Sequence, residues 1–368
     1  MRLQARWPSC NDFDCLPDPH LDGRTVCGRH DIVLRTSVDG GATWDAPRIV
    51  VSVDTDFGAS SSANASIFNV APVRDARSGN IVVLFNLQPA PYNTLAGMAN
   101  PKSRETYAVV SADGGATFSA PKNITAMLQR DAGWAASRNP TAVTPGPGIQ
   151  LANGSLLVPG YGCPLPAGAT CVTYSLNSTM RSWSYSSDDG GATWRMGAPA
   201  PAVGAGEAMA VELPGGRLLM NARAVRWKHD DKPHPDRHRL YAVSDDGGAS
   251  WHDPPAGAYA NLTGPSCEAS FVRSGDRLLF ANPASNIKRI NMTLRVSTDW
   301  AKTWSSSTVV YANSSWYSSV AVVDDAALLF FVKDCGSPIA GGGRRVGGGG
   351  VGTHWACKGI FMWRHRLE

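Results

Sequence analysis

One polar turn sequence returns five times along this chain and sets the strongest limit on its fold. Four copies are nearly identical: SVDGGATW (37–44), SADGGATF (111–118), SDDGGATW (187–194) and SDDGGASW (244–251). A fifth copy, STDWAKTW (297–304), keeps the Ser, Asp, Thr and Trp but has Trp and Ala where the others have paired glycines. The aspartates of successive copies stand 74, 76, 57 and 53 residues apart, which indicates a repeated structural unit.

The segments between these turns are typical of short β-strands. Runs such as DIVLRTS, NIVVLFNL, TYAVVSA, RLLMNAR, RLYAVSD and ALLFFVK are rich in β-branched and aromatic side chains and are bounded by Gly, Pro, Asn or Asp. Helical periodicity is nearly absent. Several strands per repeat predict an all-β, six-bladed β-propeller, because 368 residues divided among six blades leave about 61 for each. A pair of β-sandwiches is the alternative, but it gives no reason for a recurrent turn.

The repeated turn itself is predicted to be structural. Its Asp and Ser side chains can accept hydrogen bonds from backbone amides, its glycines permit positive φ, and its closing aromatic ring can pack beneath a neighbouring strand. An active site needs one constellation of residues, whereas this turn has five copies. We expect the fifth copy to be a distorted turn, since it lacks the glycines.

Composition and charge exclude several classes of protein. The net charge is +4 and the Lys and Arg residues are scattered, which argues against a nucleic-acid partner. No stretch approaches the roughly 18 apolar residues that a membrane helix needs, so we expect no transmembrane segment. No Cys-x-x-Cys pair occurs and the histidines do not alternate with cysteines, so we expect no zinc site.

Cysteines and glycosylation sequons favour the secretory pathway, in a lysosomal or extracellular setting. The chain has 8 cysteines, and the closest pairs, Cys163 with Cys171 and Cys335 with Cys357, could each close a loop. The Asn-x-Ser/Thr sequons start at Asn64, Asn123, Asn153, Asn177, Asn261, Asn291 and Asn313.

The repeated turns resemble the Asp-boxes of the sialidase (neuraminidase) superfamily, and so do four segments between them. PGPGIQLANGSLLVPGYG (145–162) is similar to a glycine-rich segment and strand of that family. GEAMAVELPGGRLLMNAR (206–223), ANPASNIKRINMTLRVSTD (281–299) and SSWYSSVAVV (314–323) resemble, in order, its segments with the catalytic glutamate, a substrate-binding arginine and the nucleophilic tyrosine. The resemblance covers almost the whole chain and implies one sialidase-like propeller domain over residues 1–368.

The resemblance also implies roles for single residues. Tyr317 would be the nucleophile and Glu207 the base that deprotonates it; Glu212 is the competing glutamate. Arg223 and Arg289 would hold the substrate carboxylate, although Lys288, next to Arg289, is an alternative.

Three further positions belong to this implied site. Arg6 would face the pocket, and Tyr161 would line it. The acid/base aspartate would lie in the long loop after Arg6. Asp22 is our choice there, Asp18 is second, and the loop leaves three more candidates open: Asp12, Asp14 and Asp31.

This residue set suits a sialic acid glycoside, which carries a carboxylate on its anomeric carbon. A carboxylate nucleophile would be repelled by this negative charge, whereas a phenol can approach as a neutral group. The phenol becomes a good nucleophile only when a base removes its proton. Planar guanidinium groups suit a fixed carboxylate. The chemistry requires no metal and no organic cofactor.

The sequence departs from the family at two places. The family's first strand, with an F/Y-R-I-P motif and the first arginine of the clamp, is not found upstream of Arg6. The second is the glycine-rich tract at 336–355, which we expect to be a flexible loop.

The resemblance thus predicts an exo-α-sialidase that releases terminal sialic acids from glycoproteins, glycolipids or oligosaccharides with retention of configuration. A transglycosylating or lyase-type variant is one alternative. The other is a non-catalytic propeller that binds glycans or proteins.

Overall fold

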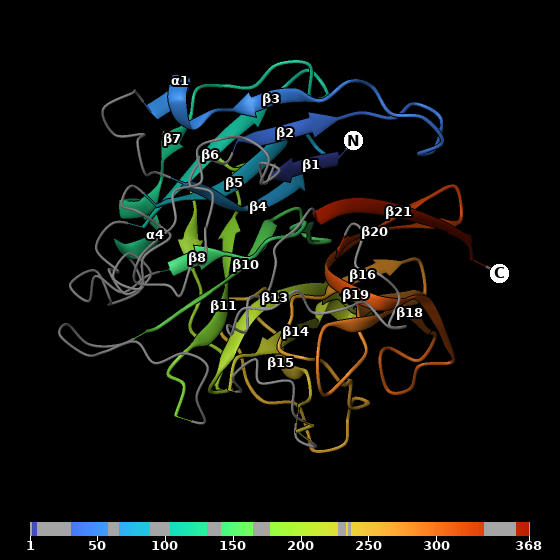
Figure 1. Cartoon of the computed structure of the whole chain (residues 1–368). Coiled ribbons are helices and arrows are strands. Elements are labelled where there is room, and N and C mark those ends of the chain that lie inside the picture. The colour runs from blue at the N-terminus through green and yellow to red at the C-terminus, as the bar shows by residue number, and fades with distance from the viewer. Residues whose placement is uncertain are drawn as a thin grey trace, which may run out of the picture.

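The computed structural model of the chain (Figure 1) describes residues 2–5, 31–57, 66–88, 104–130, 141–164, 177–226, 233–234, 237–334 and 358–367. The predicted flexible loop at 336–355 lies outside these ranges. So do Cys171, Cys335 and Cys357, and the two cysteine pairings therefore stay predictions.

Regular structure in the described ranges is almost all β. The strands are β1 (Arg2–Ala5), β2 (Ile32–Arg35), β3 (Arg48–Val51), β4 (Ser66–Arg74), β5 (Ile81–Gln88), β6 (Glu105–Ser111), β7 (Lys122–Asn123), β8 (Thr141–Val143), β9 (Ile149–Gln150), β10 (Leu156–Gly162), β11 (Arg181–Ser187), β12 (Arg195–Met196), β13 (Ala205–Glu212), β14 (Leu218–Ala224), β15 (Leu240–Ser244), β16 (Ser270–Ser274), β17 (Arg277–Pro283), β18 (Ile290–Ser297), β19 (Ser306–Val323), β20 (Ala326–Asp334) and β21 (Lys358–Arg366). The helical elements are short: α1 (Val53–Phe57), α4 (Thr125–Arg130) and the 3-10 turn η2 (Pro214–Gly216).

Antiparallel pairing groups these strands into blades. Blade I consists of β1–β3, blade II of β4–β7, blade III of β8–β12 and blade IV of β13–β15. The last sheet, β16–β21, comprises two blades because β19 serves both. Residues 306–314 of β19 pair with β18 and complete blade V, whereas residues 315–323 pair with β20 and begin blade VI.

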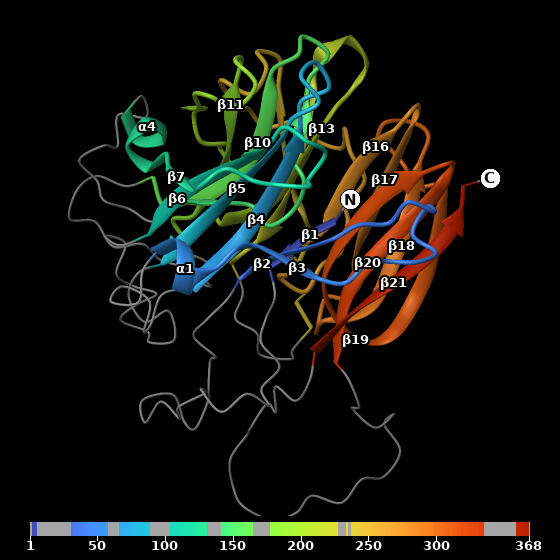
Figure 2. The ribbon, with the colours of Figure 1, turned by 90° about the horizontal axis from the view of Figure 1, so that it is seen from above.

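The six blades follow one another round a central axis (Figure 1), and Figure 2 shows the same sheets turned by 90°. The predicted all-β propeller is therefore confirmed, and the sandwich alternative is wrong.

The hydrophobic core lies between neighbouring blades, where their sheets face each other. Blades II and III share a cluster that includes Leu84, Val158 and Trp183, all fully buried. Blades IV and V share another, in which Leu219 packs with Phe271. Because their sheets are covered on both faces, strands such as β5 and β14 are buried at every position rather than at alternate ones.

The repeated turn forms the same hydrogen bonds at every copy. In the second copy, Ser111 Oγ donates to Asp113 Oδ1 (2.8 Å) and accepts from Gly115 N (2.8 Å). The other end of the turn closes when Thr117 N donates to Asp113 Oδ1 (2.9 Å) and Thr117 Oγ1 to Oδ2 (2.6 Å). The predicted structural role is thereby supported by geometry.

Each copy of the turn also contacts the preceding blade. Arg48 of β3 donates to the carbonyls of Gly115 and Ala116 in the second copy. Ser184 of β11 donates to Gly248 O in the fourth copy (2.8 Å). The turns therefore link the blades in series.

The first copy of the turn closes the ring. Its Trp44 ring meets Phe330 of β20 edge to face, with centroids 5.6 Å apart. A side chain at Gly41 would come within 3.0 Å of Leu328 Cδ1, also on β20. The first blade and the last are thus joined by the same device as the others, and Figure 1 shows them side by side.

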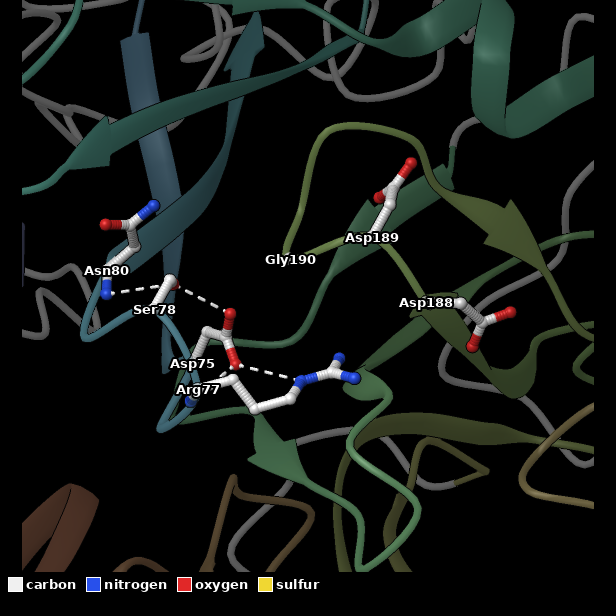
Figure 3. Close-up of a pocket in the computed structure, with 7 residues that line it drawn as sticks. All are labelled: Asp75, Arg77, Ser78, Asn80, Asp188, Asp189 and Gly190. Atoms are coloured by element: carbon white, nitrogen blue, oxygen red, sulfur yellow. Dashed lines mark hydrogen bonds and ion pairs between the residues drawn. The ribbon is translucent and has the colours of Figure 1, made fainter.

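A pocket lies at the junction of blades II and III, and it is lined mainly by polar and charged residues (Figure 3). Its lining residues are Asp75, Arg77, Ser78, Asn80, Asp188, Asp189 and Gly190. The Asp75 carboxylate accepts from Ser78 Oγ (2.7 Å) and Gln150 Nε2 (2.6 Å), and the Ser78 bond above all lowers its pKa to about 2. Asp188 forms an ion pair with Arg195. Because these carboxylates are already engaged, we interpret the pocket as part of the blade junction.

The fifth copy corrects a prediction. We expected a distorted turn, but Ser297 Oγ donates to Asp299 Oδ1 (2.9 Å) and accepts from Ala301 N (2.9 Å) as in the other copies. Trp300 and Ala301 take the glycine conformation, with φ of 64° and 67°. The hydrogen bonds and the burial of Ala301 between blades IV and V offset the cost of two left-handed non-glycine residues.

Candidate active site

Two of the predicted catalytic residues lie at β-bulges. The pairing of β13 with β14 shifts between Ala205 and Ala208, and that of β19 with β20 shifts between Ser315 and Ser318. Glu207 and Tyr317 fall within these two irregularities. A bulge turns a side chain away from the ordinary alternation of a strand, so it can direct a residue out of the packed sheet.

Tyr317, Glu207 and Arg223 meet in one hydrogen-bonded group. Tyr317 Oη donates to Glu207 Oε1 (2.5 Å), and Arg223 Nη1 donates to Glu207 Oε2 (2.6 Å). Arg223 Nη1 also lies 3.1 Å from Tyr317 Oη. Residues from blades IV and VI, which are far apart in sequence, are thereby brought together.

Burial governs the electrostatics of this group. The side chains of Arg223 and Glu207 are only 5% and 7% exposed, so their ion pair is little screened by water. Burial, followed by the charge of Glu207, raises the pKa of Tyr317 well above its ordinary value, whereas Arg223 and Arg289 lower it. The phenol is neutral at rest and has a proton acceptor within hydrogen-bond distance, which is the arrangement that a general base and its nucleophile need.

Arg289 faces the same group. Its guanidinium carbon lies 4.4 Å from the centroid of the Trp316 ring and 5.9 Å from that of Tyr317, and its Nη2 donates to Ser266 O (3.3 Å). Lys288, the alternative, is exposed.

Glu212, the competing glutamate on β13, binds elsewhere. Its Oε2 accepts from Ala152 N (2.8 Å) in blade III. Of the two glutamates on this strand, Glu207 is therefore the one that contacts Tyr317.

Tyr161 lies on β10, where its hydroxyl accepts a hydrogen bond from Asn69 Nδ2 (2.9 Å). Asn69 stands at a bulge of β4 with φ of 54°. The structure thus brings four of the seven predicted residues together, namely Glu207, Arg223, Arg289 and Tyr317, and pairs Tyr161 with a residue that the sequence did not single out.

The other two predicted residues, Asp22 and Arg6, lie outside the described residues, as do Asp12, Asp14 and Asp18. Asp31, a further candidate for the acid/base, lies within the described residues. Its Oδ1 accepts a hydrogen bond from Val53 N (3.2 Å) at the start of α1, so its carboxylate contacts the backbone of that helix.

Sequence reasoning missed several buried charged residues round the site. Glu268 and Arg239 are 1% and 5% exposed, and Arg237 is 1% exposed. Arg237 donates to Ile287 O (2.7 Å), in the turn that carries Arg289. In the sequence, Arg237 and Arg239 alternate in DRHRLYAVS, just before the strand that begins at Leu240. Alternate residues of an extended chain lie on the same face, so this pattern could have indicated that the two arginines share one environment.

Cys267 adjoins these residues. It is a free, buried thiol, and burial raises its pKa. The even cysteine count therefore does not mean that every cysteine is paired.

Within the described ranges, no group of three or more His, Cys, Asp or Glu side chains is placed to hold a metal ion. Nor is any helix in those ranges long and apolar enough to cross a membrane.

Comparison with known proteins identifies the family of the chain. Residues 22–330 match the BNR repeat-like domain family. A sialidase of Micromonospora viridifaciens is 32% identical over 330 residues, covering 84% of this chain and 45% of that protein. Human Sialidase-4 is 29% identical over 271 residues, covering 71% of this chain and 50% of its own length.

Solved structures show the same fold. The Hadza microbial sialidase Hz136 superposes with a TM-score of 0.69 at 23% identity, over 89% of this chain and 60% of that one. Trypanosoma rangeli sialidase in complex with 2,3-difluorosialic acid, described as a covalent intermediate, gives a TM-score of 0.64 at 17% identity, over 90% of this chain and 56% of that one. The chain spans about half the length of the curated relatives it matches.

Proposed function

Because the chain belongs to the sialidase family and contains its BNR repeat-like domain, we propose that it is an exo-α-sialidase that hydrolyses terminal sialic acids with retention of configuration. The proposed substrates are sialylated glycoproteins, glycolipids and oligosaccharides. The observation that carries the proposal is the hydrogen-bonded group of Tyr317, Glu207 and Arg223.

In the first proposed step, Tyr317 Oη attacks the anomeric carbon while Glu207 Oε1 takes the phenolic proton. The bond between that carbon and the leaving oxygen breaks, and Asp22 protonates the departing alcohol. The raised pKa of Tyr317 keeps the phenol protonated at rest, and a neutral phenol is a weak nucleophile, so a base must take its proton.

In the second proposed step, water attacks the anomeric carbon and transfers a proton to the Asp22 carboxylate. The bond to Tyr317 Oη breaks, and the phenolate recovers its proton from Glu207. Two displacements at one carbon give net retention.

The arginines hold the substrate. Arg223 and Arg289 would bind the carboxylate on the anomeric carbon, Arg6 would face the pocket, and Tyr161 would line it. Planar guanidinium donors fix a carboxylate in two contacts, so they orient the anomeric carbon towards Tyr317.

The test is release of methylumbelliferone from its sialic acid conjugate by the full-length protein. We expect Tyr317→Phe to lower kcat/KM by about 1000-fold or more, since the nucleophile is lost. Tyr311→Phe is the matched control, because Tyr311 lies on the same strand but packs against Phe331; it should leave activity nearly unchanged. Equal activity in the wild type and in Tyr317→Phe would disprove the mechanism.

A folded, inactive wild type that still binds free sialic acid would instead support a glycan-binding propeller. Transfer of the sugar to an added lactose acceptor, rather than to water, would identify the transglycosylating alternative.

A further inference from the structure

A second buried carboxyl group, Glu268, lies beside the proposed nucleophile. Glu268 is 1% exposed and precedes β16 in blade V. Its Oε2 accepts a hydrogen bond from Ser318 N (2.8 Å), the backbone amide that follows Tyr317. Its Oε1 has no hydrogen-bond partner among the described residues.

This hydrogen bond fixes the bulge that presents Tyr317. Ser318 begins the regular pairing of β19 with β20 after the bulge, and its hydroxyl donates to Ala281 O (2.9 Å) in blade V. Blade V therefore contacts both the amide and the hydroxyl of Ser318, and Glu268 is the side chain that accepts from the amide.

The charges that face Glu268 come from three neighbouring elements. They are Glu207 of β13, Arg223 of β14 and Arg239 just before β15, and Cys267 precedes Glu268 in the chain. Tyr317 of β19 adjoins the amide that Glu268 binds.

Both of these arginines are engaged by other acceptors. Arg223 pairs with Glu207. Arg239 donates to Asn221 Oδ1 (2.7 Å) and Cys267 O (2.6 Å). In the part of the chain that the structure describes, no cation forms an ion pair with Glu268.

Burial without an ion pair favours the uncharged acid. Burial raises the pKa of Glu268 to about 8, the Ser318 hydrogen bond opposes this rise, and the negative charge of Glu207 adds to it. Two carboxyl groups in one interior are expected to differ in protonation, since a second negative charge would be costly there.

We propose that Glu268 is a positioning residue for Tyr317, which holds the bulge of β19 through Ser318 and remains an uncharged acid while Glu207 carries the negative charge of the site. The inference rests on the proposed function for its kinetic consequence, but the protonation state of Glu268 is measurable without activity. Ionisation of Glu268 would place a second negative charge beside the phenol and the substrate carboxylate, so activity would fall on the alkaline side.

The first experiment measures the proton directly. The carboxyl carbon resonance of Glu268 is followed by NMR against pH in protein labelled at glutamate, and it is assigned by its loss in Glu268→Gln. A titration midpoint above about pH 7 supports the proposal, whereas a midpoint near the ordinary glutamate value of 4.5 overturns it. Either result stands even if the protein hydrolyses no sialoside.

The second experiment separates positioning from charge by kinetics. Glu268→Ala removes the acceptor of Ser318 N, and we expect kcat to fall roughly 10- to 100-fold with a much smaller change in KM. Glu268→Gln keeps an acceptor oxygen but cannot ionise, so it should keep at least about a tenth of kcat and lose the alkaline fall in the pH profile.

Glu212→Gln, on β13 but turned to blade III, is the control and should follow the wild-type profile. An alkaline fall in Glu268→Gln equal to that of the wild type would overturn the charge argument. A kcat in Glu268→Ala equal to that in Glu268→Gln would overturn the positioning argument.

Discussion

The chain uses carboxylates in two regions in opposite ways. In the repeated turns, Asp39 and Asp113 are exposed, and hydrogen bonds from Thr43 and Thr117 lower their pKa well below the ordinary range. Between blades IV, V and VI, Glu207 and Glu268 are buried. The turn carboxylates stay charged and fasten the blades, and five equivalent copies serve that purpose. The buried carboxyls differ from each other in their partners, since Glu207 pairs with Arg223 whereas Glu268 accepts from the backbone amide of Ser318, and unequal environments of two carboxyl groups are what acid–base chemistry uses.

The largest expected effect comes from removing the charge of Glu207 in the buried site. Glu207→Gln should lower sialoside hydrolysis by about 100- to 10,000-fold because the base is lost. It should also lower the free energy of unfolding by about 2 to 4 kcal/mol, because the buried ion pair between Arg223 and Glu207 is broken.

Asp113→Asn is the matched change in a turn. We expect activity close to wild type and only a small loss of stability, since the Asp113 carboxylate is exposed and Asn keeps one acceptor oxygen. Assays and denaturant unfolding of both variants measure the contrast, and a comparable activity loss in the two would remove the distinction between the regions.

A second prediction concerns the pH dependence of stability. The unfolded chain should release the Glu268 proton near the ordinary value of 4.5, whereas the folded protein keeps it up to about 8. The unfolded state is therefore increasingly favoured as the pH rises between these values, and stability falls. Between pH 5 and pH 8 the wild type should lose about 2 to 4 kcal/mol more than Glu268→Gln does. The measurement is the free energy of unfolding of both proteins against pH. If it changes by the same amount in the wild type and in Glu268→Gln between pH 5 and pH 8, Glu268 is not the uncharged acid.

A third prediction concerns one buried hydroxyl of a turn. Ser244 is fully buried, donates to Asp246 Oδ1 (2.8 Å) and accepts from Gly248 N (2.9 Å). Ser244→Ala should lower the free energy of unfolding by about 1 to 3 kcal/mol, because Gly248 N is left without an acceptor. Activity at low temperature should be unchanged. Loss of hydrolysis in a protein that remains folded would show that the turns contribute to the site.

The smallest expected effect is in the fifth turn. Ala301→Gly relieves a left-handed φ of 67°, which stabilises by about 1 kcal/mol. It also removes a buried methyl group, which costs about 0.8 kcal/mol. We expect a change in melting temperature within about 2 °C, and calorimetry measures it. A large destabilisation would mean that packing of the methyl group dominates.

The fold was predictable because its signals are local. Each turn carries its own hydrogen-bonding residues, so Asp113 and its neighbours form the same structure wherever the sequence occurs. The motif segments likewise identified Glu207 and Tyr317, which the structure joins although 110 residues separate them.

The buried surroundings of the site were not predictable in the same way. Glu268 is unremarkable in sequence, the alternation of Arg237 and Arg239 is a weak signal, and these residues become buried only when blades IV, V and VI close round them. The fifth turn was misjudged for a related reason, since the pocket between blades that holds Ala301 does not exist in the isolated segment.

The shared strand β19 has a consequence for local opening of the protein. Tyr317 lies close to where this strand passes from blade V to blade VI, so neither blade can detach without disturbing the backbone on either side of it. Blades V and VI should consequently exchange their amide hydrogens as one cooperative unit. The nucleophile then belongs to a segment that opens only when two blades open together, and its alignment persists through the smaller fluctuations that a single blade would undergo.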